Sequence, residues 1–255
     1  MENILHDLEE PDLESRVKVQ ELFSLLIEYS LVFLEQIMYH RGVYPKESFR
    51  QVQSFHMAVY STRHPGVRNY LDTLGQKLMS LLLAGKLSRV IIDVCSRRLR
   101  TGLSVLEQDK SFQSVGTQDH LYDKKKIESY GISFADSAII GILKDNHGDL
   151  NSVVLGEEIT LAVIYGELRS SLHSLTTQLL ELPAADSDIP PVFDVLMATE
   201  SNNGNDNFTE MVLDDQWVLA GRLGSSTNEE TPTVWKSIRE ADIGIINIKG
   251  YISVL

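Results

Sequence analysis

The residue types that most often carry out chemistry are few in this sequence and widely spaced. The seven histidines are scattered along the chain, and none is paired with a cysteine or a carboxylate at the spacing of metal ligands. The sequence contains neither a glycine-rich nucleotide-binding loop nor the HExxH motif of zinc proteases. We therefore predict no catalytic site, no metal site and no cofactor, and we expect a protein that is not an enzyme.

One acidic stretch, DNHGDLNSVVLGEE, has a faint likeness to a calcium-binding loop. Asp145, Asp149 and Asn151 fall at positions that supply ligands in such a loop. The glycine expected at the sixth position is replaced by Leu150, however, and the carboxylate expected at the twelfth position is replaced by Gly156. A solvated turn is therefore the favoured interpretation.

Two further motifs are better explained by structure than by chemistry. The basic run DKKKIE (residues 123–128) is bounded by Asp123 and Glu128, which favours a solvated face. Cys95 is the only cysteine and lies in the predicted strand SRVIIDVCS, so we expect a buried apolar side chain rather than a nucleophile. A single cysteine excludes an intrachain disulfide and agrees with a reducing compartment.

The composition argues against several classes of protein. A formal net charge of −13 and an isoelectric point near 4.9 argue against independent binding to nucleic acid, which requires a basic surface. The N-terminal stretch MENILHDLEEPDLES lacks the basic start and apolar run of a signal peptide. The apolar stretch that follows carries Glu21, Glu28 and Glu35, which makes it a poor membrane span. We expect an intracellular protein that binds neither nucleic acid nor membranes directly.

Hydrophobic periodicity predicts the elements that would position any site. Three segments have the spacing of amphipathic helices: residues 17–39, 65–85 and 160–182. Five shorter apolar segments are typical of strands: residues 50–61, 88–96, 191–199, 208–221 (one or two strands) and 244–255. Residues 108–158 are polar and rich in turn residues, so we expect an insertion in which only SFADSAIIGIL forms a short strand. The whole is predicted to be an acidic tail (1–16) followed by a single domain (17–255).

The C-terminal third alternates short apolar segments with polar loops and contains both tryptophans, Trp217 and Trp235. Two interpretations stay open. The segment is either an ordinary edge hairpin with its tryptophans in the core, or a β segment whose aromatic residues cover a bound peptide. Tryptophan fits the second role because it buries a large area and keeps one polar group, and it is enriched at binding hot spots.

Several motifs, in this order along the chain, resemble the HORMA domain family. They are YHRGVYPKESF, HPGVRNYLDTL, RVIIDVCS, ELRSSLHSLTTQLLELP, FDVLMAT and DDQWVLAG. The similarity covers roughly residues 17–107 and 160–255 and is greatest to the non-catalytic accessory subunits of translesion DNA polymerase zeta. It implies an α+β fold in which three helices pack on a mixed or antiparallel sheet. It also implies a C-terminal segment, residues 200–255, that closes over a partner peptide as a safety belt.

The resemblance assigns candidate site residues as well. The peptide-binding positions of the family fall on Tyr70, Trp217, Leu219, Pro232, Val234 and Trp235. The family's dimerisation arginine falls on Arg169. From the sequence alone, Tyr70 could equally be a core residue and Arg169 a solvent-facing charge. We expect Tyr44-Pro45 to end the first helix and to turn the chain toward the first sheet region, with Phe49 in the core.

The partners that the resemblance implies are proteins. It implies a nuclear adaptor, with the cytoplasm as a second location, that clamps a proline-containing peptide of the catalytic subunit of polymerase zeta. A second surface in the terminal strands would bind the deoxycytidyl transferase that scaffolds translesion synthesis, although Lys249 stands near a position where the family has an aromatic residue. A second HORMA domain and an AAA+ remodelling ATPase are further implied partners. Two alternatives stay open: an adaptor of the spindle checkpoint or the meiotic chromosome axis, and a small-molecule enzyme with a site beside His120 or His147.

Overall fold

The computed structural model describes residues 17–99, 122–145, 149–150, 153–183, 189–199 and 234–255. Its helices are α1 (Val19–His40), α2 (Pro65–Leu83), α3 (Ala138–Asp145) and α4 (Leu161–Glu181), with one 3₁₀ turn, η1 (Lys46–Ser48). Its strands are β1 (Phe49–Ser54), β2 (Met57–Thr62), β3 (Leu87–Leu99), β4 (Tyr122–Ser133), β5 (Val192–Thr199), β6 (Val234–Asp242) and β7 (Asn247–Val254).

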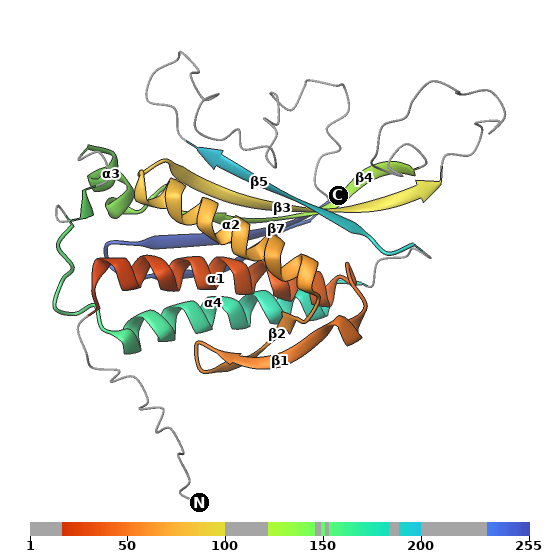
Figure 1. The fold of residues 1–255 in the computed structure, drawn as a ribbon, viewed down its shortest axis with the longest axis horizontal. Helices are drawn as coiled ribbons and strands as arrows, with labels where there is room; N and C mark the ends of the chain where they lie inside the picture. Colours follow the sequence, from red (N-terminus) through yellow and green to blue (C-terminus); the bar gives the residue numbers. More distant parts are fainter. Residues whose placement is uncertain (1–16, 100–121, 146–148, 151–152, 184–188, 200–233) are drawn as a thin grey trace, which may run out of the picture.

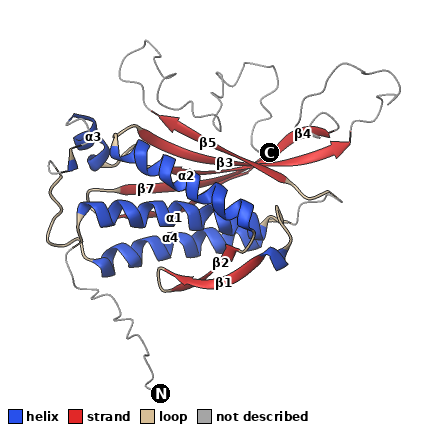
Figure 2. Cartoon of the chain, in the orientation of Figure 1, coloured by secondary structure: helices blue, strands red, loops and turns tan. Residues whose placement is uncertain are grey.

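These elements form two layers (Figures 1 and 2). Helices α1, α2 and α4 lie on one face of a five-stranded antiparallel sheet whose strand order is β5-β3-β4-β7-β6. Strands β1 and β2 form a separate hairpin that packs beside α1. Because α2 contacts β3 and α4 contacts β6, the helix layer spans much of the sheet. We call the face of the sheet away from these helices the outer face.

Helix α1 is the central element of the core. Most of its residues are buried, including Phe23, Tyr29 and Phe33, so it is surrounded by the rest of the fold. By length and composition α1 could cross a membrane, but 72% of its most apolar window is buried inside the protein. This burial is the behaviour of a core helix and explains why the segment is apolar on almost every side.

The end of α1 follows from its sequence. Gly42 adopts a left-handed conformation with φ of 65°, which glycine reaches without strain. The Val43 N–H donates to the Met38 carbonyl at 3.0 Å, the pattern of a Schellman cap. Pro45 then precedes η1, and Phe49 begins β1 as a buried side chain. The expected turn after the first helix and the core position of Phe49 are both confirmed.

The three glutamates of α1 do not all face water. Glu21 and Glu28 are exposed, and the Glu28 carboxylate accepts from the Ser54 hydroxyl at 2.7 Å. Glu35 is only 7% exposed, and it accepts from the Thr62 N–H at 2.8 Å. The hairpin therefore covers the end of the acidic stripe, and Glu35 is satisfied by hydrogen bonds rather than by water.

The segment predicted as one strand over residues 50–61 is a hairpin. Its turn residues, Phe55 and His56, both have left-handed φ values, 49° and 56°, without glycine at either position. Alternation of apolar and polar residues predicted strand structure but could not mark this turn. The buried Phe55 ring packs edge-to-face on Tyr165 of α4 at 5.6 Å between ring centroids, and this contact offsets the strain of the turn.

The block that was expected to be an insertion contributes to the centre of the fold. Strand β4 lies within it and pairs with β3 on one side and β7 on the other. Residues 138–143, expected in a short strand, belong instead to helix α3, which runs to Asp145. Its buried residues Ile139, Ile140 and Leu143 are spaced by one and three, so they share one helical face. The helix has only eight residues, too few for periodicity to distinguish it from a strand.

The other two long helices begin as their sequences predict. At α2, Pro65 occupies the first turn, and the His64 ring accepts from the Val67 N–H at 3.4 Å. At α4, the Thr160 hydroxyl accepts from the Val163 N–H at 3.4 Å. Both helices bury a leucine-rich face against α1 and the sheet, which confirms the helices predicted over 65–85 and 160–182.

Candidate partner-binding site

Strand β5 is an edge strand of the large sheet. One side pairs with β3 along the whole strand, from Val192 opposite Cys95 to Thr199 opposite Leu87. Among the described residues, no strand pairs with its other side. Every residue of β5 is partly exposed, as expected at an edge. A strand edge presents main-chain N–H and C=O groups in a row, which is a template for an added strand.

Three aromatic side chains meet at the start of β5. Phe193 lies edge-to-face against Tyr70 at 5.8 Å and against Tyr44 at 6.4 Å between ring centroids. Tyr70 is placed by the first turns of α2, and Tyr44 by the turn between α1 and η1. We call Tyr44, Tyr70 and Phe193 the aromatic trio.

Both tyrosines of the trio are half-buried and stay protonated at neutral pH. Burial, reinforced by the nearby Asp194 carboxylate and by Tyr44, raises the pKa of Tyr70 to about 12. Burial also raises the pKa of Tyr44. Each therefore offers a phenolic hydroxyl as a hydrogen-bond donor beside an apolar ring, which suits a peptide with apolar side chains and free carbonyl groups.

The two faces of β5 differ in character. Phe193, Val195 and Met197 alternate along the strand and pack against the core on the side of the helices. Asp194 and Leu196 lie between them and face outward, and Asp194 forms an ion pair with Lys124 of β4. A strand added to β5 would therefore place one set of side chains beside an apolar, aromatic strip and the alternate set beside charged groups.

After β5, the chain continues to β6, the next described strand, which lies at the opposite edge of the sheet. It leaves β5 at Thr199, opposite Leu87, and re-enters at Val234 of β6, on the far edge of the sheet. A five-stranded sheet is about 20 Å wide. Residues 200–233 are long enough for this crossing, because an extended chain spans about 3.3–3.6 Å per residue.

Comparisons with known sequences give short, low-identity matches. No protein-family model matches the chain. It is 38% identical over 74 residues to the mitotic spindle checkpoint protein MAD2 of Zea mays, a match that covers 29% of this chain and 36% of that protein. It is 24% identical over 82 residues to the DNA polymerase zeta processivity subunit of Schizosaccharomyces pombe, covering 32% and 38% respectively. The matches thus span little more than a third of these relatives.

Solved structures match almost the whole chain. One is a chain of the mitotic checkpoint complex, with a TM-score of 0.59 and 12% identity, which covers 91% of this chain and 97% of that one. Another is HTP-1 of C. elegans bound to the HIM-3 closure motif, with a TM-score of 0.53 and 11% identity, covering 92% and 91%. The chain has the HORMA fold. This confirms the expected fold class.

Within this HORMA fold, the predicted peptide-binding residues lie at two separate edges. Tyr70 lies in the aromatic trio beside β5. Val234 and Trp235 lie on β6, at the opposite edge of the sheet. Trp217, Leu219 and Pro232 lie outside the described residues. The binding role of all six residues stays a prediction.

Trp235 does not lie in the core. Its side chain is 63% exposed on the outer face, and its ring lies 5.5 Å from that of Tyr251 on β7. Tyr251 in turn lies over Gly131 of β4, where a Cβ atom would overlap its ring. Trp235 is therefore an accessible aromatic residue on a supported platform, distinct from the aromatic trio.

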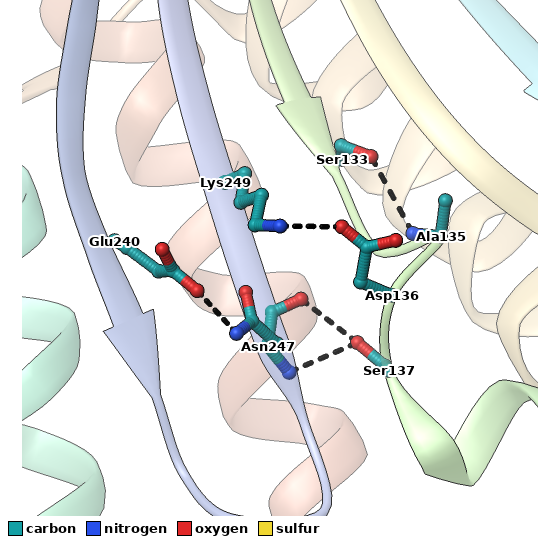
Figure 3. Close-up of polar contacts among 7 residues, drawn as sticks. All are labelled: Ser133, Ala135, Asp136, Ser137, Glu240, Asn247 and Lys249. Carbon is teal, nitrogen blue, oxygen red and sulfur yellow. Dashed lines mark hydrogen bonds and ion pairs between the residues drawn. The ribbon is translucent and has the colours of Figure 1, made fainter.

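Lys249 of β7 belongs to a group of polar contacts at the terminal strands. Its ammonium group forms an ion pair with Asp136 at 2.6 Å, which raises the pKa of Lys249 (Figure 3). Beside it, the Ser137 hydroxyl donates to the Asn247 carbonyl at 2.8 Å and accepts from the Asn247 N–H at 3.0 Å. The Asn247 side chain also donates to Glu240. These polar contacts tie β7 to the segment between β4 and α3 and, through Glu240, to β6.

Arg169 is exposed on α4, and its role in dimerisation stays a prediction. His120 and His147, which would flank a small-molecule site, lie outside the described residues. Among the residues that the structure does describe, no group of three histidine, cysteine or acidic side chains could hold a metal ion. Cys95 is buried, and burial raises the pKa of its thiol to about 11, so its thiolate is scarce at neutral pH.

A buried ion pair fixes the end of α4, from which the chain leads to β5. Arg41, the C-cap of α1, donates through Nε to Glu128 of β4 at 2.7 Å and through a second nitrogen to the same carboxylate. That second nitrogen also donates to the Pro183 carbonyl at 2.9 Å. The Tyr130 hydroxyl donates to Glu128 at 2.7 Å. The sequence does not predict this cluster, because its members are far apart in the chain and none of them lies in a recognisable motif.

Proposed function

We propose that this protein is a non-enzymatic adaptor that binds an extended peptide along β5. The observation that carries the proposal is the open edge of β5 beside the aromatic trio. Main-chain groups of the edge would supply affinity, and the apolar strip of Phe193, Val195 and Met197 would select alternate side chains of the peptide. Tyr70 would contact the peptide directly.

We further propose that residues 200–233 close over the bound peptide. The chain enters this segment at the end of β5 and leaves it at the opposite edge of the sheet, so its path begins beside the peptide. Trp217 and Leu219 would then contact the peptide from the side opposite to β5. A peptide enclosed in this way leaves slowly, because release requires part of the protein to open first. The similarity in fold to HTP-1, whose structure contains a bound closure motif, supports this arrangement.

The finer proposal is an accessory subunit of DNA polymerase zeta in the nucleus. The bound peptide would be a proline-containing segment of the polymerase catalytic subunit, and the terminal strands would contact the deoxycytidyl transferase scaffold. Support comes from the sequence motifs and from the similarity to the processivity subunit of S. pombe. A net charge of −13 agrees with an adaptor that reaches DNA only through its partners.

A spindle-checkpoint or meiotic adaptor is the second candidate function. It is favoured by the stretch of 74 residues that is 38% identical to MAD2 of Zea mays, a higher identity than that of the polymerase zeta subunit. The two candidates share the site on β5 and differ in the peptide that it accepts.

Calorimetric titration separates these functions. The full chain would be titrated with a proline-containing peptide of the polymerase zeta catalytic subunit and, in parallel, with a checkpoint peptide. Tyr70→Ala and Trp217→Ala should each weaken the preferred peptide by about 2 kcal/mol or more if they are hot spots. Tyr165→Ala is the matched control, because Tyr165 is also half-buried but lies under the β1–β2 turn. Preference for the checkpoint peptide would select the second candidate, and no binding of either would remove both.

A further inference from the structure

Strands β3 and β4 extend beyond the rest of the sheet. Strand β5 reaches only as far as Cys95 on β3. Strand β7 reaches only as far as Glu128 on β4, where the Leu255 N–H donates to the Ile127 carbonyl at 2.9 Å. Past these points, among the described residues, residues 96–99 pair only with β4 and residues 122–126 pair only with β3. We call these two segments the β3–β4 ribbon.

The ribbon is basic although the protein is acidic. Arg97, Lys124, Lys125 and Lys126 lie on it, in a chain whose net charge is −13. The side chains of Lys124 and Lys126 are each 42% exposed. Both already hold carboxylates on the outer face. Lys124 forms an ion pair with Asp194, and Lys126 lies 3.7 Å from Asp93.

Two chemistries therefore meet along residues 124–126. Strand β4 pairs with β7 only from Glu128 to Ser133. Along residues 124–126, the same side of β4 has no strand partner among the described residues, so its main-chain groups form an edge. Three consecutive lysines lie along this edge: Lys124 and Lys126 share the outer face, and Lys125 lies on the opposite face of the strand. A strand edge recognises an extended peptide backbone, and a row of ammonium groups recognises carboxylates.

We propose that the β3–β4 ribbon is a second docking edge, which binds an acidic, extended segment of a partner protein as an added strand beside Lys124–Lys126. This edge faces away from β5, so both edges could be occupied at once. A peptide is favoured over nucleic acid for two reasons. Only a peptide can pair with both the N–H and the C=O groups of the edge as an added strand, and the net charge of the protein repels a phosphate backbone at long range.

Edge lysines can also serve to protect a strand edge, and this alternative role predicts a different result. Lysine on an exposed strand edge prevents edge-to-edge association between molecules. If protection were the only role here, removing lysines would cause self-association without affecting any peptide. If the edge is a docking site, removing lysines weakens binding of an acidic peptide. Analytical ultracentrifugation of the variants distinguishes the two.

The test uses a fluorescent octapeptide of alternating glutamate and valine and measures its anisotropy with the full chain. The double variant Lys125→Gln/Lys126→Gln should bind at least about tenfold more weakly than the native protein. The control Lys18→Gln/Lys86→Gln changes the net charge equally at two exposed sites outside the ribbon and should stay within about twofold. Amide hydrogen exchange should slow across residues 124–127 when the peptide is bound.

Several results would overturn the proposal. One is equal weakening of octapeptide binding in both double variants, and another is unchanged amide exchange at residues 124–127 when the peptide is present. The others are equally tight binding of a lysine–valine octapeptide and displacement of the acidic octapeptide by duplex DNA at matched charge concentration. Self-association of the ribbon variant without loss of peptide binding would assign the lysines to edge protection instead. Tyr70→Ala should leave the octapeptide unaffected. Loss of binding in that variant would place the octapeptide on β5 and refute a second docking edge. This result would leave the proposed peptide-binding role of β5 intact.

Discussion

The buried pair of Arg41 and Glu128 should be one of the most sensitive points in the fold. Their side chains are 4% and 6% exposed, so neither charge is solvated by bulk water. Arg41→Met leaves the Glu128 carboxylate buried with the Tyr130 hydroxyl as its remaining partner among the contacts described. Breaking a buried ion pair in this way costs about 3–5 kcal/mol of unfolding free energy. Glu128→Met should be comparably destabilising, because it leaves the guanidinium with only the Pro183 carbonyl among the contacts described.

The double variant Arg41→Met/Glu128→Met should be far more stable than the sum of the two single variants. Two apolar side chains can replace a buried ion pair at little net cost. What remains is the Tyr130 hydroxyl, which loses its acceptor and costs about 1–3 kcal/mol. Adding Tyr130→Phe removes that hydroxyl, and the triple variant should approach the stability of the native protein.

Urea unfolding followed by circular dichroism would measure these free energies in a double-mutant cycle. The expected signature is strong coupling, with each single variant worse than the double. Additive effects, or single variants that lose less than about 1 kcal/mol, would show that water reaches the pair and that the burial argument is wrong.

Three further predictions concern other parts of the molecule. Arg169→Ala on the exposed face of α4 should convert a dimer to a monomer, and an unchanged sedimentation profile would contradict the predicted role of Arg169. His56→Gly should raise the unfolding free energy by about 1 kcal/mol, because glycine adopts φ of 56° without strain. A lower unfolding free energy, measured by chemical denaturation, would show that contacts of the His56 ring outweigh the strain. Burial raises the pKa of Glu35 above 4.5, so the folded protein binds a proton at this carboxyl more tightly than the unfolded chain does. The unfolding free energy should therefore fall as the pH rises from 4.5 through the folded-state pKa of Glu35. In Glu35→Gln, the midpoint of thermal unfolding should no longer fall for this reason between pH 4.5 and 7. An unchanged pH profile in the variant would show that Glu35 is not the group responsible.

The long helices were predictable because each has enough turns for its apolar face to be counted. Strand β3 was predictable as an apolar run bounded by polar residues, and β5 in the same way. The central strand β4 was hidden by its composition. One of its faces points to the outer side of the sheet, and its first half belongs to the basic ribbon, so DKKKIE has the composition of a solvated face. Its side chains Lys124–Lys126 are indeed exposed, but the backbone beneath them is paired with β3.

The candidate site was only partly predictable for a related reason. Tyr70 was assigned from a motif, but its neighbours Tyr44 and Phe193 come from segments that the fold brings together. Phe193 could have been placed on the same face as Val195 and Met197 from alternation alone. That this face meets α2 depends on strand order, which no local pattern encodes. The separation of Trp235 from Tyr70 has the same cause, since β6 pairs at the opposite edge of the sheet.

The strand order also constrains how the protein can be made. Strand β7 is synthesised after β4 and β6, yet it lies between them. While the chain is still on the ribosome, β4 and β6 have no direct partner for these edges, and the sheet cannot close until β7 has left the exit tunnel. Such late, long-range pairing is slow and exposes unpaired edges to other chains. The nascent protein should therefore depend on chaperones until β7 has emerged, and a stop codon before β7 should yield an aggregating product.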